Sequence, residues 1–394
     1  MKSRPFFAAR LEDRLNRVLN RFLLRRGWQE CITSYTGFGT TRQVRVLARV
    51  VLRPPKDAGI AQAATDLLHR RGWRNFIAAA KVTSRAEIVI GDLRVPVQAD
   101  RGGYIDVRIR DHGLPVGWHQ VLIEGAGGAS NWAPVHVIDE NQTFGIVSDI
   151  DDTILSTWLP RPMVAAWNSL VLTEQARQAV PGMSRLFQEL IAAHPGAPLI
   201  FVSTGAWNTY PMVTRFLKRH GFPHGALLLT DWGPTNTGWF RSGAHHKRTC
   251  LRELARDLPN IRWLLVGDDG QHDPDLYAEF ASLQPDHVVA RAIRQLTPGE
   301  HALAHGTLTE TPDIWDWTPD LAPEVRAPDG DGLADKLRPL IRLKEICTSP
   351  WPKPPRSSRN TSWTSTSPRR WSPVSSSTPT PSSMPVPCRM RATV

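Results

Sequence analysis

Acidic and hydroxyl side chains directly follow an apolar run in the segment FGIVSDIDDT, residues 144–153. They are Asp149, Asp151, Asp152 and Thr153, and a buried strand followed by carboxylates is typical of a ligand site at the carboxyl end of a sheet. A phosphate monoester repels an attacking carboxylate unless a divalent cation neutralises both, so this pattern favours metal-assisted phosphoryl transfer. We predict Asp149 as the nucleophile and Asp151 as the acid/base group, which protonates the leaving oxygen and later takes a proton from water.

Two other interpretations of this acidic run are a solvated turn and a calcium-binding loop. An EF-hand loop needs glycine at its sixth position and a bidentate glutamate at its twelfth, whereas this chain has Ile154 and Pro160 there. A solvated turn seldom follows an apolar strand so closely. Further candidate residues downstream also favour a phosphoryl-transfer site over a turn.

A hydroxyl and a lysine come next in chain order. The apolar run in PLIFVSTGAWN ends in Ser203, Thr204 and Gly205, where a hydroxyl can donate to a phosphoryl oxygen. The same residues are also ordinary in turns and helix caps. Lys247 lies near the start of an expected amphipathic helix, where an ammonium group could stabilise charge on phosphoryl oxygens. Taken alone, Lys247 would be interpreted as a surface lysine.

A third apolar run, in RWLLVGDDGQHDPDLY, ends in a group of acids. Gly267, Asp268 and Asp269 end the run, and Asp273 follows at an expected helix start. Oxygen clusters of this kind suit hard cations such as Mg²⁺, and Gly267 would let the backbone turn sharply beside an ion. An acidic loop before a helix is the alternative interpretation, and it is compatible with metal binding.

These motifs together, Asp-x-Asp-x-Thr, strand-Ser, Lys and Gly-Asp-x4-Asp, resemble the four motifs of the haloacid dehalogenase superfamily. More narrowly, SDIDDT, VSTGAWN, LLLTDWGPTNTGWFRSGAHHK and VGDDGQHDPDLYAE resemble the catalytic domain of the actin-patch-type phosphatidate phosphatases and their bacterial relatives, over about residues 141–295. One departure stands out. Relatives more often have Ser-Asn-Ser-Pro-Trp where this chain has Ser-Thr-Gly-Ala-Trp at residues 203–207, so the substrate contacts of this segment are open.

The resemblance implies roles for individual residues. Asp149 would be phosphorylated, Asp151 would be the acid/base, Ser203 would bind the phosphoryl group and Lys247 would stabilise its charge. Asp149, Asp151 and Asp268 would hold Mg²⁺. The supporting residues in these motifs are Thr153, Thr204, Gly205, Gly267, Asp269 and Asp273.

The resemblance also implies a substrate, phosphatidate, which would be hydrolysed to diacylglycerol, or a related lipid phosphate. A soluble phosphomonoesterase is the alternative within enzymes. A noncatalytic lipid- or protein-binding module is the alternative of another class, although such a module would not need the full set of motifs. The loop at residues 230–243 is the candidate substrate loop, unless its aromatic side chains simply pack on the domain. Its candidate residues are Trp232, Trp239, Phe240 and Arg241.

The spacing of apolar runs predicts an α/β catalytic domain at residues 141–300. Strands separated by helical patterns imply a parallel sheet, and the resemblance implies a three-layer, haloacid-dehalogenase-like (Rossmann-like) arrangement. About 45 residues separate the first two motifs, which leaves room for a small cap or none. The expected strands are 144–148, 198–202, 226–229, 262–266 and 287–290.

Three further regions flank this domain. Residues 1–140 read as an amphipathic helix, at 6–26, followed by a small β-rich domain, a sandwich or barrel without a catalytic cluster. Residues 301–347 read as a helical extension in which KLRPLIRLKEI would form the last helix. Residues 348–394 contain ten prolines, 19 serines or threonines and no acid, so we expect a disordered tail. The composition of this tail differs so much from that of the rest of the chain that it also suggests a shifted reading frame near Cys347.

Composition limits the function classes. Seven of the formal +11 charges lie in the tail, and no nucleic-acid-binding signature is present, so we expect no nucleic-acid partner. No apolar run approaches the roughly 20 residues of a spanning helix, and no signal-peptide core is visible. We therefore expect a cytoplasmic protein, with peripheral membrane contact through the helix at 6–26 or with that helix simply covering its own domain. The oligomeric state is open.

Overall fold

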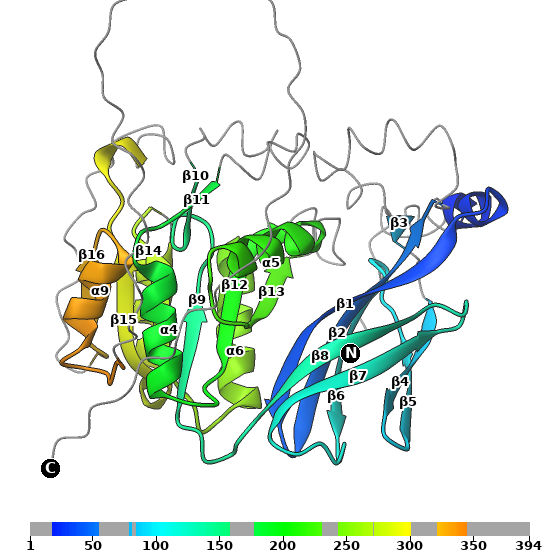
Figure 1. Ribbon diagram of the computed structural model, residues 1–394, viewed down its shortest axis with the longest axis horizontal. Coiled ribbons are helices and arrows are strands. Elements are labelled where there is room, and N and C mark those ends of the chain that lie inside the picture. The colour runs from blue at the N-terminus through cyan, green and yellow to red at the C-terminus, as the bar shows by residue number, and fades with distance from the viewer. Residues whose placement is uncertain are drawn as a thin grey trace, which may run out of the picture. The chain divides into compact units, whose positions relative to one another are not determined.

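The computed structural model describes residues 18–54, 79–80, 84–157, 177–230, 243–270, 272–300 and 321–344. In these parts the chain is α/β, with an eight-stranded, mostly antiparallel sheet, here called sheet A, and a six-stranded parallel sheet, here called sheet B (Figure 1). This agrees with the expected fold class, in which a parallel α/β sheet occurs together with a β-rich part. No helix in the described parts is long and apolar enough to cross a membrane.

Predicted motif residues lie at or just beyond the ends of three strands of sheet B, while Lys247 lies on helix α6 (Gly243–Asp257) and Asp273 on helix α7 (Asp273–Leu283). The strands of sheet B run in the order β13-β12-β9-β14-β15-β16, and every neighbouring pair is parallel. The strands predicted from the apolar runs are confirmed, with small differences at their ends. The strands of sheet B are β9 (Phe144–Ser148), β12 (Leu199–Ala206), β13 (Ala226–Thr230), β14 (Arg262–Asp268), β15 (Val288–Arg294) and β16 (Glu324–Ala327).

Helices connect these strands, as expected for parallel pairing. Helix α4 packs with α9, and α6 packs with α7. The helices are α4 (Met183–Ala193), α5 (Tyr210–Arg219), α6 (Gly243–Asp257), α7 (Asp273–Leu283) and α9 (Gly330–Leu337), with short 3₁₀ turns η3 (Trp207–Thr209) and η4 (Pro285–His287).

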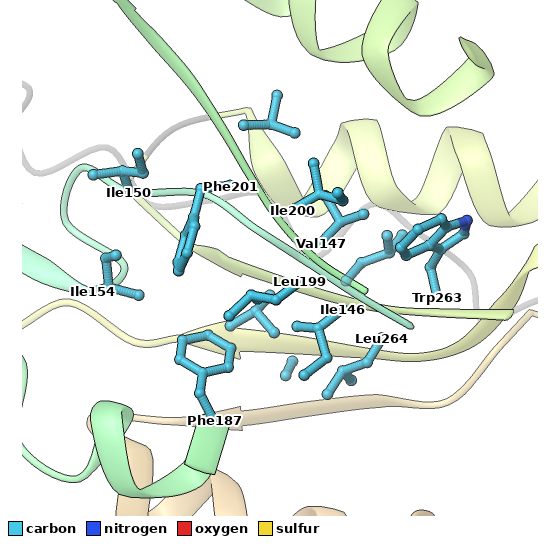
Figure 2. Packing of buried hydrophobic residues seen from close by; sticks show 14 of the residues in the cluster. Ile146, Val147, Ile150, Ile154, Phe187, Leu199, Ile200, Phe201, Trp263 and Leu264 are labelled. Atoms are coloured by element: carbon cyan, nitrogen blue, oxygen red, sulfur yellow. The ribbon is translucent and has the colours of Figure 1, made fainter. Parts of the chain in front are cut away.

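Sheet B is buried on both faces, which explains why its strands read as continuous apolar runs rather than as alternating ones. Figure 2 shows Ile146 on the same side of the strands as Phe187 of α4, and Val147 on the opposite side. Phe187 and Phe201 meet edge to face, with ring centres 6.3 Å apart. Trp263 is fully buried. The packing of this core fixes the positions of the strands relative to one another, and so the positions of the strand ends that carry the candidate site.

Sheet A has a separate apolar core, and strands such as β4 alternate buried and more exposed residues, whereas the longer β2 is buried along most of its length. Val46, Ile88, Ile105 and Val121 are among the side chains in this core. Strands β1 and β8 pair in parallel, and the other pairs are antiparallel. Its strands are β1 (Gln29–Thr40), β2 (Gln43–Arg53), β3 (Ala79–Ala80), β4 (Arg85–Ile90), β5 (Leu93–Gln98), β6 (Tyr104–Arg110), β7 (Gly117–Gly125) and β8 (Ser130–Ile138).

Aromatic and charged contacts join sheet A to the α/β region. The Tyr35 ring on β1 stacks on Trp207, with ring centres 4.3 Å apart. The backbone N–H of Thr36 donates to the Tyr210 hydroxyl at 3.3 Å. Arg45 of β2 forms an ion pair with Glu253 of α6 at 2.9 Å. Trp207 follows the Ser-Thr-Gly segment directly, so sheet A packs against the chain next to one predicted motif.

The C-terminal extension differs from the sequence prediction. We expected the last helix in KLRPLIRLKEI, which begins at Lys336, but α9 is earlier and ends at Leu337. Pro339 explains the difference, because proline has no N–H for a helical hydrogen bond and its ring disfavours a helix before it. Residues 324–327 form β16, an additional edge strand of sheet B.

Several other predictions concern residues outside the described parts. The helix expected at 6–26 is described as a helix at residues 18–25. Between the first two motifs, β10 (Leu155–Thr157) and β11 (Arg177–Ala179) form a two-stranded sheet. The segment between these two strands and the tail at 348–394 lie outside the described residues.

Candidate active site

The register of sheet B brings three predicted residues to one edge. Ser148, the last residue of β9, pairs with Phe201 of β12 on one side and with Val266 of β14 on the other. Asp149 lies one residue beyond this row, and Ser203 and Asp268 each lie two residues beyond it. Because parallel strands end at the same edge, these three side chains converge at the usual ligand position of an open α/β sheet.

Three buried carboxylates form a compact cluster at this edge. One oxygen from each of Asp149, Asp268 and Asp273 lies within 4.8 Å of the others. Asp149 follows β9, Asp268 ends β14, and Asp273 lies in the first turn of α7. An all-oxygen donor set of this kind fits Mg²⁺ in type.

Lys247 joins two members of the cluster. Its Nζ lies 2.8 Å from Asp149 Oδ1 and 2.5 Å from Asp273 Oδ1, and its side chain is buried. Lys247 in isolation would be interpreted as a surface lysine, and the sequence predicts it at the site only together with the other motifs; in the structure, α6 places it against the carboxylates at the strand ends. The ammonium group therefore lies where it can stabilise negative charge brought to Asp149.

Asp151 lies on the Ser203 side of the site. The Ser203 hydroxyl donates to Asp151 Oδ2 at 3.1 Å and accepts from the Gly205 N–H at 2.9 Å. Thr230 on β13 donates to the carbonyl of Thr204 at 2.8 Å. The compact carboxylate cluster thus contains Asp273, whereas the predicted ligand set had Asp151 in that position.

The supporting residues have distinct structural contacts. The Thr153 hydroxyl donates to Asp268 Oδ2 at 3.2 Å. A Cβ on Gly267 would lie 2.6 Å from Asp273 Oδ2, so glycine leaves room for the cluster. Asp269 Oδ1 accepts from the backbone N–H of Leu296 at 2.8 Å. Asp269 therefore connects β14 to the end of β15.

Burial and mutual repulsion dominate the electrostatics. Burial raises the pKa of Asp149 to about 8, against the opposing effect of Lys247. The pKa of Asp268 is also raised well above its usual value, by burial and by the charges of Asp273 and Asp149. Burial opposes the charge of Lys247, but Asp149 and Asp273 outweigh it and raise its pKa. When all three carboxyl groups are ionised they outnumber the one ammonium group, and a divalent cation would neutralise the excess negative charge, which helps to raise the pKa values of Asp149 and Asp268.

Sequence reasoning missed one buried pair beside the site. Arg294, at the end of β15, donates to the carbonyl of Asp152 at 2.6 Å and to Glu300 Oε1 at 2.7 Å. Ser156 donates to the same glutamate oxygen at 3.0 Å. Arg294 ends a strand and Glu300 lies in a helical turn that begins at residue 298, and no pattern in the sequence links either residue to the Asp-x-Asp-x-Thr turn. The candidate substrate-loop residues, Trp232, Trp239, Phe240 and Arg241, lie outside the described residues.

Comparison with known proteins identifies similarity in the same region. Residues 144–295 match the family described as phosphatidate phosphatase APP1, catalytic domain. An uncharacterised protein of Schizosaccharomyces pombe is 27% identical over 163 residues, which cover 41% of this chain and 26% of that protein. Phosphatidate phosphatase APP1 of Saccharomyces cerevisiae is 26% identical over 153 residues, which cover 38% of this chain and 25% of that protein.

The matched region spans about a quarter of the length of these two relatives. Among solved structures, a carbohydrate acetylesterase from Xanthomonas citri is 10% identical, with a TM-score of 0.24, over 68% of this chain and 70% of that one. So low a score carries no argument about fold or function. The sequence matches fall on the region that carries the residues gathered at the edge of sheet B: over residues 144–295, the chain is similar to the phosphatidate phosphatase APP1 catalytic domain.

Proposed function

We propose that the protein is a Mg²⁺-dependent phosphatase that acts through an aspartyl-phosphate on Asp149 and hydrolyses phosphatidate or a related lipid phosphate. The observation that carries the proposal is the contact of Lys247 with both Asp149 and Asp273, at 2.8 and 2.5 Å, inside a buried carboxylate cluster. The match to the phosphatidate phosphatase family supports the choice of substrate.

In the first half of the reaction, an oxygen of Asp149 attacks phosphorus as the bond from phosphorus to the ester oxygen breaks. Asp151 gives a proton to that leaving oxygen, which departs as the alcohol, diacylglycerol in the case of phosphatidate. Lys247 is placed to stabilise charge on the phosphoryl oxygens. The hydroxyl of Ser203, 3.1 Å from Asp151, is placed to donate to one of them.

In the second half, water attacks phosphorus while Asp151 takes a proton from it. The bond to Asp149 breaks, releasing inorganic phosphate and restoring both carboxyl groups. Asp149, Asp268 and Asp273 would hold the cation, with Asp151 as the further ligand expected from sequence. When bound, Mg²⁺ would neutralise the carboxylate and the phosphate so that the two can approach.

The proposed architecture follows from this assignment. Residues 141–300 would form a haloacid-dehalogenase-like domain with a small cap or none, preceded by the β-rich domain at 1–140. The extension at 301–347 and the tail at 348–394 would follow. A small cap leaves the site open to a bulky substrate, and the loop carrying Trp232, Trp239, Phe240 and Arg241 would contact it.

Phosphate release from phosphatidate in mixed micelles, and from a panel of soluble phosphomonoesters, tests the proposal. Both are measured with Mg²⁺ and with chelator, for the natural protein and for Asp149→Asn. We expect Mg²⁺-dependent release from phosphatidate and none from the variant. Release of phosphate from the soluble esters alone would refute phosphatidate as the substrate and keep the proposed mechanism, with a soluble phosphomonoester as the substrate. Near-normal activity in Asp149→Asn would refute the mechanism, and no release from either substrate class would favour a binding module.

A further inference from the structure

The helix at residues 18–25 presents its apolar side outward. Asn20 is buried, with 8% of its surface exposed, whereas Val18 is 62%, Leu19 45%, Phe22 50% and Leu24, on the side of Asn20, 44% exposed. At 100° per residue, Val18, Leu19 and Phe22 share one side of the helix, and Asn20 lies on the other. A helix that merely covers its own domain turns its apolar side inward. The outward apolar side chains of the helix at residues 18–25 would therefore be buried by something other than the helix's own domain.

Arginines lie beside this outward apolar face, Arg21 and Arg25 along one flank and Arg26 in the turn after the helix. Arg21, Arg25 and Arg26 are all exposed, and the Arg26 guanidinium lies 4.8 Å from the centre of the Phe22 ring. Residues 18–29 include no aspartate or glutamate. An apolar strip flanked by long cationic side chains suits the boundary between acyl chains and anionic head groups.

The direction of β1 relates this helix to the candidate site. Gly37 lines a small cavity together with Pro198 and Leu199, at the start of β12. Tyr35 instead stacks on Trp207, just beyond the end of β12. Strands β1 and β12 therefore run in roughly opposite directions. The beginning of β1 lies toward the end of β12, and so toward the edge of sheet B that carries the carboxylates.

The first residue of β1, Gln29, is six residues before Tyr35. In an extended strand, these six residues place Gln29 about 20 Å beyond Tyr35 in that direction. The helix ends shortly before Gln29. The helix thus lies toward the same side as the catalytic edge. A protein acting on a lipid in a membrane would need this arrangement, because the membrane-binding surface and the site must face the bilayer together.

We propose that the helix at residues 18–25 inserts Val18, Leu19 and Phe22 into the interfacial layer of an anionic membrane, and so holds the candidate site against the lipid surface. The arginines favour an anionic bilayer over an apolar protein groove. The choice of a lipid surface also rests on the proposed lipid-phosphate activity.

Vesicle co-sedimentation tests this proposal without using the proposed substrate as the ligand. The full chain is mixed with phosphatidylcholine vesicles and with vesicles that also contain phosphatidylserine. We expect binding to the anionic vesicles, and a bound-to-free ratio about tenfold or more lower for Phe22→Asp. The matched control is Leu283→Asp at the end of α7, where the leucine is 60% exposed, and we expect binding equal to that of the natural chain.

A second variant, Arg25→Glu, tests the charged rim without altering the apolar side chains. It should lower binding to the anionic vesicles severalfold. Hydrolysis of a soluble phosphomonoester should be unchanged in Phe22→Asp, while hydrolysis of phosphatidate in vesicles falls with the bound fraction. Absence of all hydrolysis with vesicle binding intact would refute the proposed function and leave the membrane surface standing.

Two results would overturn the membrane proposal. One is equal vesicle binding by the natural chain and Phe22→Asp. The other is no vesicle binding by the natural chain, together with a dimer that Phe22→Asp dissociates in light scattering. That second result would assign the apolar face to another copy of the chain. Either result could accompany normal phosphatidate hydrolysis in detergent micelles, so failure of this inference is distinguishable from failure of the proposed function.

Discussion

The guanidinium of Arg294 donates to the backbone carbonyl of Asp152 at 2.6 Å, in the middle of the Asp-x-Asp-x-Thr turn. Asp152 has a φ of 59°, a left-handed conformation that is uncommon for residues other than glycine. Arg294 also contacts Glu300 at 2.7 Å, and both side chains are buried. The pair thus connects the end of β15 to the turn that carries the predicted nucleophile and acid/base.

Replacement of Arg294 should destabilise the protein. Arg294→Met leaves Glu300 buried without its ion-pair partner and removes the donor to Asp152, so we expect the free energy of unfolding to fall by about 3–5 kcal/mol. Urea denaturation measures the change. In the double variant with Glu300→Gln the loss should be smaller, because the unpaired charge is gone. A double variant as unstable as the sum of both single variants would contradict coupling between the two residues.

Loss of Lys247 should slow catalysis more than it disturbs folding. Lys247→Met keeps much of the side chain but removes the charge beside Asp149, and we expect kcat on a soluble phosphomonoester to fall by about 10²-fold or more. Circular dichroism with Mg²⁺ present monitors the fold. Arg248→Met is the control, because Arg248 is the next residue but pairs with Glu279 on the surface. Equal rates for these two variants would exclude a special role for Lys247.

A methyl group at position 267 should disturb the proposed metal site. In Gly267→Ala the new Cβ would meet Asp273 Oδ2 at 2.6 Å and the Tyr277 ring at 2.8 Å, so Asp273 must move. We expect Mg²⁺ affinity, measured by calorimetry, to weaken about tenfold, which corresponds to roughly 1.4 kcal/mol. Gly299→Ala is the control, since nothing lies within 4 Å of its added Cβ. Unchanged affinity in Gly267→Ala would remove Asp273 from the proposed site.

Stability should depend on pH through His136 on β8. Burial lowers the pKa of His136 to about 4, with a smaller contribution from His224, whereas an unfolded histidine titrates near 6.5. Between these values the unfolded chain binds more protons than the folded chain, so stability decreases as pH falls from about 6.5 to 4. A shift of this size is worth up to about 3 kcal/mol.

His136→Phe provides the test, because phenylalanine can keep the ring stacked on Trp118, 4.5 Å away in the natural chain. Thermal unfolding from pH 4 to 8 should show a flatter profile for the variant below pH 6.5 and parallel profiles above it. Burial also lowers the pKa of His224, so some acid sensitivity should remain. An unaltered slope in the variant would assign the pH dependence to other groups.

Part of the site was predictable from local sequence. Asp149 and Asp268 each follow an apolar strand, and parallel pairing brings such strand ends together whatever connects them. In each motif, an apolar strand followed directly by a polar residue was therefore enough to predict that Asp149, Asp268 and Ser203 lie at one edge of the parallel sheet. The strands at 144–148 and 262–266 were predictable for the same reason, because strands buried on both faces leave continuous apolar runs.

The tertiary structure decided the contacts between distant segments. Lys247 is buried against Asp149 and Asp273 because it lies near the start of α6, a helix that packs on β12 and β13, while Asp151 instead accepts from Ser203. Arg294 reaches the Asp152 carbonyl from 142 residues away. The sequence by itself determined which chemical groups are present and at which strand ends they lie, because periodicity and strand order are local properties. Which groups touch depends on the packing of helices and strand ends, and only the folded chain brings these together.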